Sequence, residues 1–181
     1  MYNVIIKRHV AAFNTDSLNR AAVCESNLPN GAVVTLTGKS TNEGESRVWV
    51  SAAPASGNAA GLWMVASPEV VTLTDALGNE YKGLTADPRA FVNIAGKTMD
   101  VFKPQKSDII WIAPADVVGT INTTNKYLVP TGDGTSFTLT ASSTAGTGLC
   151  FQLIGERAIE IPNGGIVKNL VTGYEFECIN N

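Results

Sequence analysis

The sequence predicts an all-β fold with mainly antiparallel strands, arranged as a sandwich or as a barrel. Roughly a dozen short apolar and β-branched runs recur at a spacing of about 8–12 residues, which is typical of such folds. Turn sequences separate these runs, most clearly at residues 28–34 and 161–167, where Pro-Asn-Gly precedes an apolar run. Proline presets φ and Asn-Gly tolerates a positive φ, so both segments favour tight hairpins.

Strands and polar loops alternate in the first half of the chain. The strands are expected at residues 2–7, 21–25, 32–37, 47–51 and 62–66. The first Pro-Asn-Gly turn is expected to join the second and third of these into a hairpin. Residues 70–97 are expected to form a connecting loop with one short helix near residues 88–95. Asp87 suits its N-cap, Pro88 its first position and Gly96 the position after its end.

Strand patterns resume in the second half. The expected strands are residues 98–103, 108–113, 126–129, 135–140, 149–154, 157–161, 166–171 and 174–179. Residues 104–107 form a candidate hairpin turn, and residues 130–134 form another, with Asp133 as a turn residue. The run Ile-Ile-Trp-Ile at residues 109–112 is continuously apolar, which predicts a strand buried on both faces.

Two domain arrangements fit this order of elements. In one, residues 1–181 form a single compact β-rich unit, which their number allows. In the other, two small β lobes at residues 1–70 and 98–181 are joined by residues 71–97. The repeated Pro-Asn-Gly turn is compatible with a duplication, but one short matching segment does not decide between them.

The composition argues against several classes of partner. The net charge is −3 and basic residues do not cluster, so we expect no direct binding of nucleic acid. No stretch approaches the roughly 18 apolar residues of a membrane span, so we expect no membrane insertion. Cys24, Cys150 and Cys178 lie far apart, which argues for buried free thiols rather than disulfides or a zinc site. Charged residues make up only 16% of the chain, which suits extensive contact with other proteins.

Residues for covalent chemistry are scarce. His9 is the only histidine and is expected at the surface, near a strand end. Gly38-Lys39-Ser40 has the ending of a phosphate-binding loop, but Val33 stands where the first glycine of that motif is needed. The remaining candidates are spread too widely for a metal site: Asp87, Asp100, Asp108, Asp116 and Asp133. We therefore predict no catalytic residues, no metal and no cofactor, and keep a hydrolase with carboxylates assembled in space as a third alternative.

Two features are candidates for contact with another protein. Trp49 points away from Val48 and Val50, so it either packs into a second layer or forms an exposed contact. Trp63 and Trp111 lie in apolar runs and are expected in the core. The N-terminal strand, with Tyr2, Val4 and Ile6 on one face, either adds to the sheet of a neighbour or forms the edge of its own sheet.

Six short segments in the first two thirds of the chain carry a resemblance to a known family: residues 4–9, 30–36, 62–69, 91–97, 101–104 and 108–110. They resemble small capsid decoration proteins, also called cement proteins, of tailed bacteriophages. In that family Gly-Asp would be expected in the turn before residues 109–112, whereas this chain has Ser107-Asp108. This difference affects the type of turn that is expected at residues 107–108, but not the expected hairpin.

The resemblance implies a structural protein of the virion, made in the host cytoplasm and located on the capsid exterior. It would bridge major capsid protein subunits, and self-association on the capsid is a second expected contact. Tyr2, Val4, Ile6 and Trp49 would then be the candidate capsid contacts. The alternative is a virion fibre or receptor-binding β module that binds a host glycan or surface protein, and such a module would expose aromatic side chains in a groove.

Overall fold

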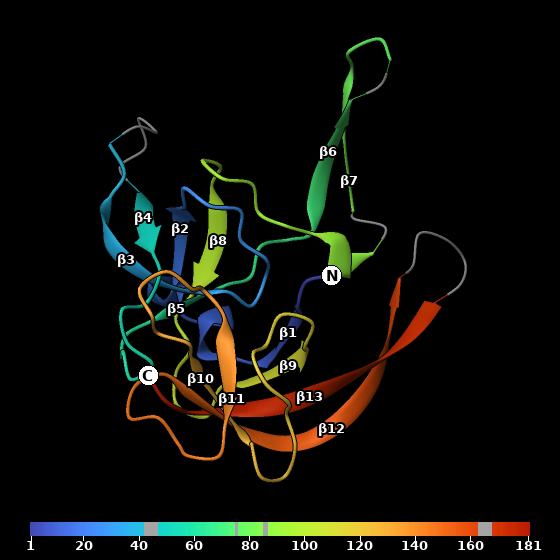
Figure 1. The fold of residues 1–181 in the computed structure, drawn as a ribbon. Helices are drawn as coiled ribbons and strands as arrows, with labels where there is room; N and C mark the ends of the chain where they lie inside the picture. The colour runs from blue at the N-terminus through green and yellow to red at the C-terminus, as the bar shows by residue number, and fades with distance from the viewer. Residues whose placement is uncertain (42–46, 75, 85–86, 163–167) are drawn as a thin grey trace.

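The structure is a computed structural model that describes residues 1–41, 47–74, 76–84, 87–162 and 168–181. It confirms the all-β expectation: a closed barrel and a larger sheet form the body, and a two-stranded ribbon projects from it (Figure 1). Short 3₁₀ turns supply the helical part, and η1 (Ala11–Phe13) and η2 (Asp16–Leu18) lie between the first two strands. No helix in the described ranges is long and apolar enough to cross a membrane.

The barrel has five strands, which close in the order β2, β4, β3, β5, β8. Their bounds are β2 (Asn19–Val23), β3 (Val33–Lys39), β4 (Val48–Ala52), β5 (Trp63–Val65) and β8 (Met99–Phe102). All neighbours are antiparallel except β2 and β4, which run parallel. Small and branched side chains such as Ala22, Val34 and Val101 fill one core cluster, against which Trp49 and Trp63 pack while staying partly exposed.

The larger sheet has six strands in the order β1, β9, β13, β12, β10, β11. Their bounds are β1 (Val4–His9), β9 (Ile109–Ala113), β10 (Tyr127–Pro130), β11 (Leu139–Ser142), β12 (Cys150–Pro162) and β13 (Lys168–Asn180). Strand β9 lies between β1 and β13, and Ile110, Trp111 and Ile112 are buried, as predicted for a strand covered on both faces. Ile110 and Ile112 join the main core with barrel residues, whereas Trp111 packs on the opposite face with Val4.

Two predicted hairpins are wrong. Strand β2 pairs with β4 and β8, while β3 pairs with β4 and β5, so the first Pro-Asn-Gly turn connects strands that are not neighbours. Residues 104–107 likewise carry the chain from β8 in the barrel to β9 in the sheet. Local turn chemistry predicted a reversal of direction correctly, but burial against distant strands decided which strands become neighbours.

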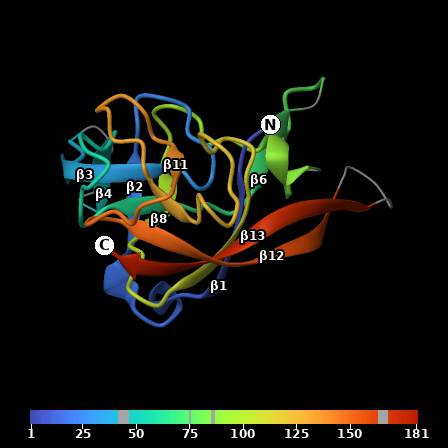
Figure 2. The same ribbon diagram turned by 60° about the horizontal axis from the view of Figure 1, so that its bottom comes forward.

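The hairpin of β10 and β11 is confirmed, and so is the role of Asp133 in its turn. The second Pro-Asn-Gly sequence falls on residues 163–167, which lie outside the described ranges. Its flanking strands pair continuously from Pro162 and Lys168 to Cys150 and Asn180, apart from two register shifts. The four strands expected there are therefore two long ones, which cross the whole sheet as a twisted ribbon (Figure 2).

The predicted helix near residues 88–95 is much shorter than expected. Only Pro88–Ala90 forms a 3₁₀ turn, η3, and Asp87 caps it by accepting a hydrogen bond of 2.9 Å from the Arg89 backbone. Phe91 is already extended, because the backbone of Asn93 exchanges two hydrogen bonds with that of Leu28. The loop expected around this helix instead contains a ribbon of β6 (Val70–Thr74) and β7 (Glu80–Leu84).

The two sub-lobes considered from the sequence exchange strands. Strand β1, from residues 1–70, pairs with β9 in the large sheet. Strand β8, from residues 98–181, closes the barrel between β2 and β5. The main core joins Val33, Met64 and Phe102 of the barrel to the inner face of the sheet, so one apolar layer connects the two parts.

Candidate binding surfaces

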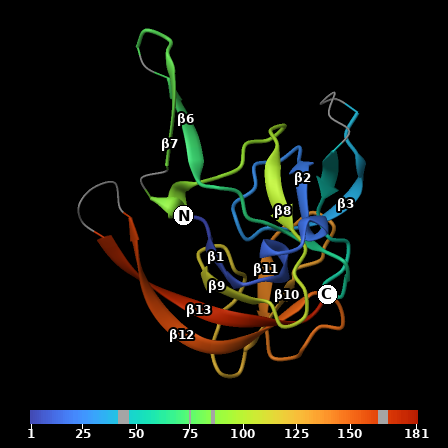
Figure 3. The same ribbon diagram turned by 180° about the vertical axis from the view of Figure 1, so that it is seen from behind.

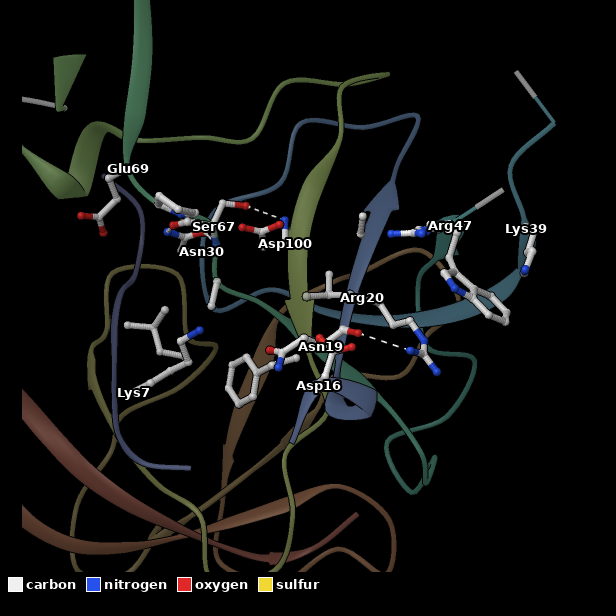
Figure 4. Close-up of a pocket in the computed structure, with 17 residues that line it drawn as sticks. Lys7, Asp16, Asn19, Arg20, Asn30, Lys39, Arg47, Ser67, Glu69 and Asp100 are labelled. Carbon is white, nitrogen blue, oxygen red and sulfur yellow. Dashed lines mark hydrogen bonds between the residues drawn. The ribbon is translucent and has the colours of Figure 1, made fainter. Parts of the chain in front are cut away.

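A groove of about 930 Å³ runs along the outside of the barrel (Figure 4). Its wall is formed by β2 and β8, with β1 at one end and residues of β3 and β4 at the other. Most of the lining is polar or charged: Lys7, Asp16, Asn19, Arg20, Asn30, Lys39, Arg47, Ser67, Glu69 and Asp100. The barrel is closed, so the groove presents side chains and no free strand edge.

Arg20 lines this groove and lies close to two indole rings. Its guanidinium carbon lies 5.8 Å from the ring centroid of Trp49 and 5.5 Å from that of Trp63. Strand β2 pairs with β4, which places Arg20 next to the strand that carries Trp49. The one hydrogen bond of its guanidinium within the described residues is long, 3.4 Å to the Asn19 carbonyl. Both distances are within the range of a cation–π contact, and most donors of the guanidinium have no hydrogen-bond partner among the described residues.

Lys39 and Arg47 extend this positive end of the groove. Lys39 is opposite Trp49 in the pairing of β3 and β4, and Arg47 immediately precedes β4. Both side chains are exposed. Within the described part of the chain the one ion pair joins Arg89 to Asp87 at 2.7 Å, so neither cation is neutralised there by a carboxylate.

The other end of the groove carries acidic and hydrogen-bonded groups. Asp100 and Glu69 line it together with Asn30 and Ser67 (Figure 4). Burial raises the pKa of the Glu69 carboxyl, and a hydrogen bond with Asn30 partly offsets this effect. Charges of both signs line the groove, since Lys7 lies on β1 near this end and Asp16 lies beside Asn19 nearer to Arg20 (Figure 4).

The structure places the four residues predicted as contacts in different environments. Val4 is only 3% exposed and packs against Trp111, so its side chain does not reach the surface. Ile6 is half-buried in the same cluster, whereas Tyr2 is exposed and its backbone N–H donates to the Arg89 carbonyl. Strand β1 is the edge strand of its own sheet, which was one of the two alternatives for this segment. Trp49 is half-buried and lines the groove.

The residues considered for catalysis lie in several different parts of the described structure. His9 is exposed at the end of β1, and Lys39 ends strand β3, which is not the geometry of a phosphate loop. Of the five aspartates considered, Asp100 lines the groove, while Asp108 is buried and accepts hydrogen bonds from the Ala11 and Gln105 backbones. Across the described ranges no group of three or more His, Cys, Asp or Glu residues could hold a metal ion.

Two ribbons form a second candidate surface, which the sequence reasoning missed. The β6–β7 ribbon pairs with none of the other described strands, and beyond Arg157 and Gly173 the β12–β13 ribbon has only its own two strands. Both ribbons leave the same side of the body, where the N-terminus also lies (Figures 1 and 3). The run Val-Val-Thr-Leu-Thr at residues 70–74, followed by Gly-Asn at 78–79, was the available signal for the first ribbon.

Large apolar side chains on these ribbons are exposed to solvent. Leu77, between β6 and β7, is 87% exposed, and Leu170 on β13 is 72% exposed. Val70 at the base of β6 is also exposed. Exposed apolar side chains also occur on the body, among them Phe13, Ile94 and Val118, so the ribbons are distinguished by their projection and not by their apolar content.

Comparisons with protein-family models, with curated proteins and with solved structures found no match to this chain.

Proposed function

We propose that this protein is a structural component of a bacteriophage virion, which binds the outer surface of the capsid and bridges major capsid protein subunits. The resemblance of residues 4–9, 30–36 and 62–69 to decoration proteins suggests the class of partner. The observation that carries the proposal is the pair of two-stranded ribbons that project from one side of the body. A body with two separate arms suits contact with more than one neighbouring subunit.

Physical chemistry supports a binding role for these arms. An isolated two-stranded hairpin is at best marginally stable in water, because its strands bury little surface. The outer ends of both ribbons lack a third described strand and expose Leu77 and Leu170. Burial of these side chains against a partner would offset the cost of ordering the ribbons. Many copies, each with a modest interface, would then hold the subunits of a shell together.

Co-sedimentation with purified, undecorated and expanded phage heads tests the proposal. We expect saturable binding at a fixed number of copies per shell and a higher melting temperature of the particle. Absence of binding, or binding that does not saturate, would contradict the proposed function.

A set of surface variants tests whether the ribbons make the contact. We expect Leu77→Ser and Leu170→Ser each to weaken binding to heads by roughly fivefold or more, without lowering the stability of the free protein. Ile94→Ser is the matched control, since Ile94 is an exposed apolar residue of the body. Equal effects of all three substitutions would contradict the role of the ribbons.

A fibre or receptor-binding module is the second candidate, and one observation favours it. The half-buried Trp49 lines an open groove beside polar side chains, which is an arrangement that glycan-binding sites use. Binding of the free protein to a neutral glycan array, lost in Trp49→Ala, would support this function over capsid binding.

A further inference from the structure

We propose that the end of the groove formed by Arg20, Lys39 and Arg47, the basic cluster, binds an acidic polypeptide segment of the partner protein. The inference deepens the proposed function and rests on it for the identity of that partner as a capsid subunit. Its chemistry follows from two observations: the Arg20 guanidinium lies close to two indole rings, and Lys39 and Arg47 have no carboxylate partner among the described residues.

Arg20 is prepared to receive a carboxylate. The rings of Trp49 and Trp63 lie 5.8 and 5.5 Å from its guanidinium carbon and restrict its rotation. Arginine binds a carboxylate through two parallel hydrogen bonds, and a side chain that is already ordered loses less conformational entropy on binding. The 3.4 Å contact with the Asn19 carbonyl uses a single donor of the group.

Lys39 and Arg47 add positive charge beside Arg20. Figure 4 shows all three side chains on the same side of the groove, away from Glu69. The described structure pairs none of them with a carboxylate, although the chain as a whole carries a net charge of −3. A local cluster of unpaired cations in an acidic protein attracts anionic groups selectively.

The groove fits a polypeptide better than a saccharide or a small anion. Its volume of about 930 Å³ exceeds what a single carboxylate needs, and Val101 and Phe102 contribute to its wall. Arg20 already occupies one face of both indoles, which removes those faces from stacking with a sugar ring. Asp100, Glu69 and Lys7 line the other end, so the acidic residues of the segment are expected at the basic cluster.

Titration of the full-length protein with a defined peptide provides the first test. The probe is a capped hexapeptide, Glu-Glu-Glu-Ala-Thr-Ala, and its control is Gln-Gln-Gln-Ala-Thr-Ala. At low ionic strength, where surface charges are little screened, we expect saturable shifts of the Trp49 and Trp63 indole N–H signals with the acidic peptide alone. No saturable shift, or equal shifts with both peptides, would overturn the inference.

Variants locate the binding site. The double variant Lys39→Gln with Arg47→Gln should bind the acidic peptide roughly three- to thirtyfold more weakly, and both side chains are exposed, so folding is not at risk. Arg20→Lys should also weaken binding, because lysine keeps the charge but lacks the planar donor pair. Lys106→Gln, an exposed cation in the turn before β9, is the control and should bind as the original protein does. Unchanged affinity in the double variant would overturn the assignment.

The same variants on phage heads separate this inference from the proposed function. If the original protein binds heads, the double variant should bind more weakly at low salt, and the difference should shrink at high salt. Equal binding of both proteins at low salt would overturn the inference and leave the proposed function intact. If the original protein fails to bind heads while the acidic peptide binds the groove, the proposed function fails and the chemistry of the groove stands. Tighter binding of a hyaluronate tetrasaccharide than of the acidic peptide would overturn the choice of a polypeptide.

Discussion

The side chain of Asn30 pairs with the backbone of Ser67 as another strand would. Its amide nitrogen donates to the Ser67 carbonyl at 2.9 Å, and its oxygen accepts from the Ser67 N–H at 3.0 Å. The oxygen also accepts from the Asn93 amide at 3.3 Å. Asn30 is buried, so this amide holds together three segments that are far apart in the sequence. The first Pro-Asn-Gly turn therefore connects the segments around Ser67 and Asn93 through hydrogen bonds, and it does not close a hairpin.

Asn30→Ala should destabilise the protein by about 1–3 kcal/mol, because it leaves the partly buried N–H and carbonyl of Ser67 without these partners. Urea unfolding followed by circular dichroism measures this loss. Asn27→Ala is the control, since Asn27 is exposed and accepts one hydrogen bond of 2.8 Å from the Ala95 N–H. Asn27→Ala should lower the free energy of unfolding by about 1 kcal/mol or less. Similar losses in both variants would show that Asn30 has no special role.

Gly173→Ala should destabilise the protein by about 3 kcal/mol or more. A Cβ at this position would overlap the Trp111 ring, which is fully buried and donates to the Arg157 carbonyl at 3.1 Å. Gly155→Ala, in the partner strand, meets no atom within 4 Å and should change stability by less than about 1 kcal/mol. Thermal unfolding of both variants checks this difference, and equal melting temperatures would contradict it.

Ser107→Gly should stabilise the protein by about 0.5–1 kcal/mol. Ser107 has a φ of 72°, a conformation that strains a side-chain-bearing residue and that glycine adopts freely. Lys106→Gly, at the preceding position, should instead destabilise by a similar amount, because it only increases the entropy of the unfolded chain. Chemical denaturation distinguishes the two, and destabilisation by Ser107→Gly would contradict the interpretation.

Acid should weaken the turn between β10 and β11. Backbone N–H groups of Thr135 and Ser136 donate to Asp133 and lower the pKa of its carboxyl below the usual 3.8. A lowered folded-state pKa contributes stability above the unfolded value, and this contribution is lost as the pH falls through the folded value. The stability difference between the original protein and Asp133→Asn should therefore be constant near neutral pH and shrink below about pH 4. A difference that does not depend on pH would contradict this assignment.

The thiols should be unreactive in the folded protein. Cys24, Cys150 and Cys178 are all buried, and burial is the main cause that raises the pKa of Cys178 to about 12. Since the thiolate is the reactive form, a disulfide reagent at about pH 8 should label none of the three thiols before unfolding and all of them after it. Rapid labelling of Cys178 in the native state would contradict the packing of β12 against β13.

The fold class was predictable from the sequence because it depends on local patterns. The apolar run at residues 109–112 predicted a doubly covered strand, and β9 is one. Pro-Thr-Gly-Asp-Gly at residues 130–134 predicted the turn of a hairpin, and the adjoining strands β10 and β11 pair. These predictions needed only the periodicity of side chains and the φ preferences of turn residues.

The candidate binding surfaces were less predictable. The sequence singled out Trp49, but its neighbours in the groove come from β2 and β3, whose positions depend on barrel closure. No local pattern places Arg20 between two indoles that are 14 residues apart in the sequence. Residues 70–74 have the β-branched pattern of a strand. Asp87 and Pro88 predicted a helix in the same connecting segment, and the strand pattern was overlooked.

Apart from β6 and β7, the sequence by itself determined which segments become strands, where the chain turns and that the thiols are buried. The tertiary structure decided which strands are neighbours, that Phe91 is extended and that Arg20 meets Trp49 and Trp63. The physical reason is the range of the interactions. Propensities and turn preferences act over a few residues, whereas strand pairing and burial depend on hydrogen bonds and apolar contacts between distant segments. The backbone pairing of Leu28 with Asn93 is an example. It keeps the chain extended after Ala90, although Asp87 caps the start of a helical turn there.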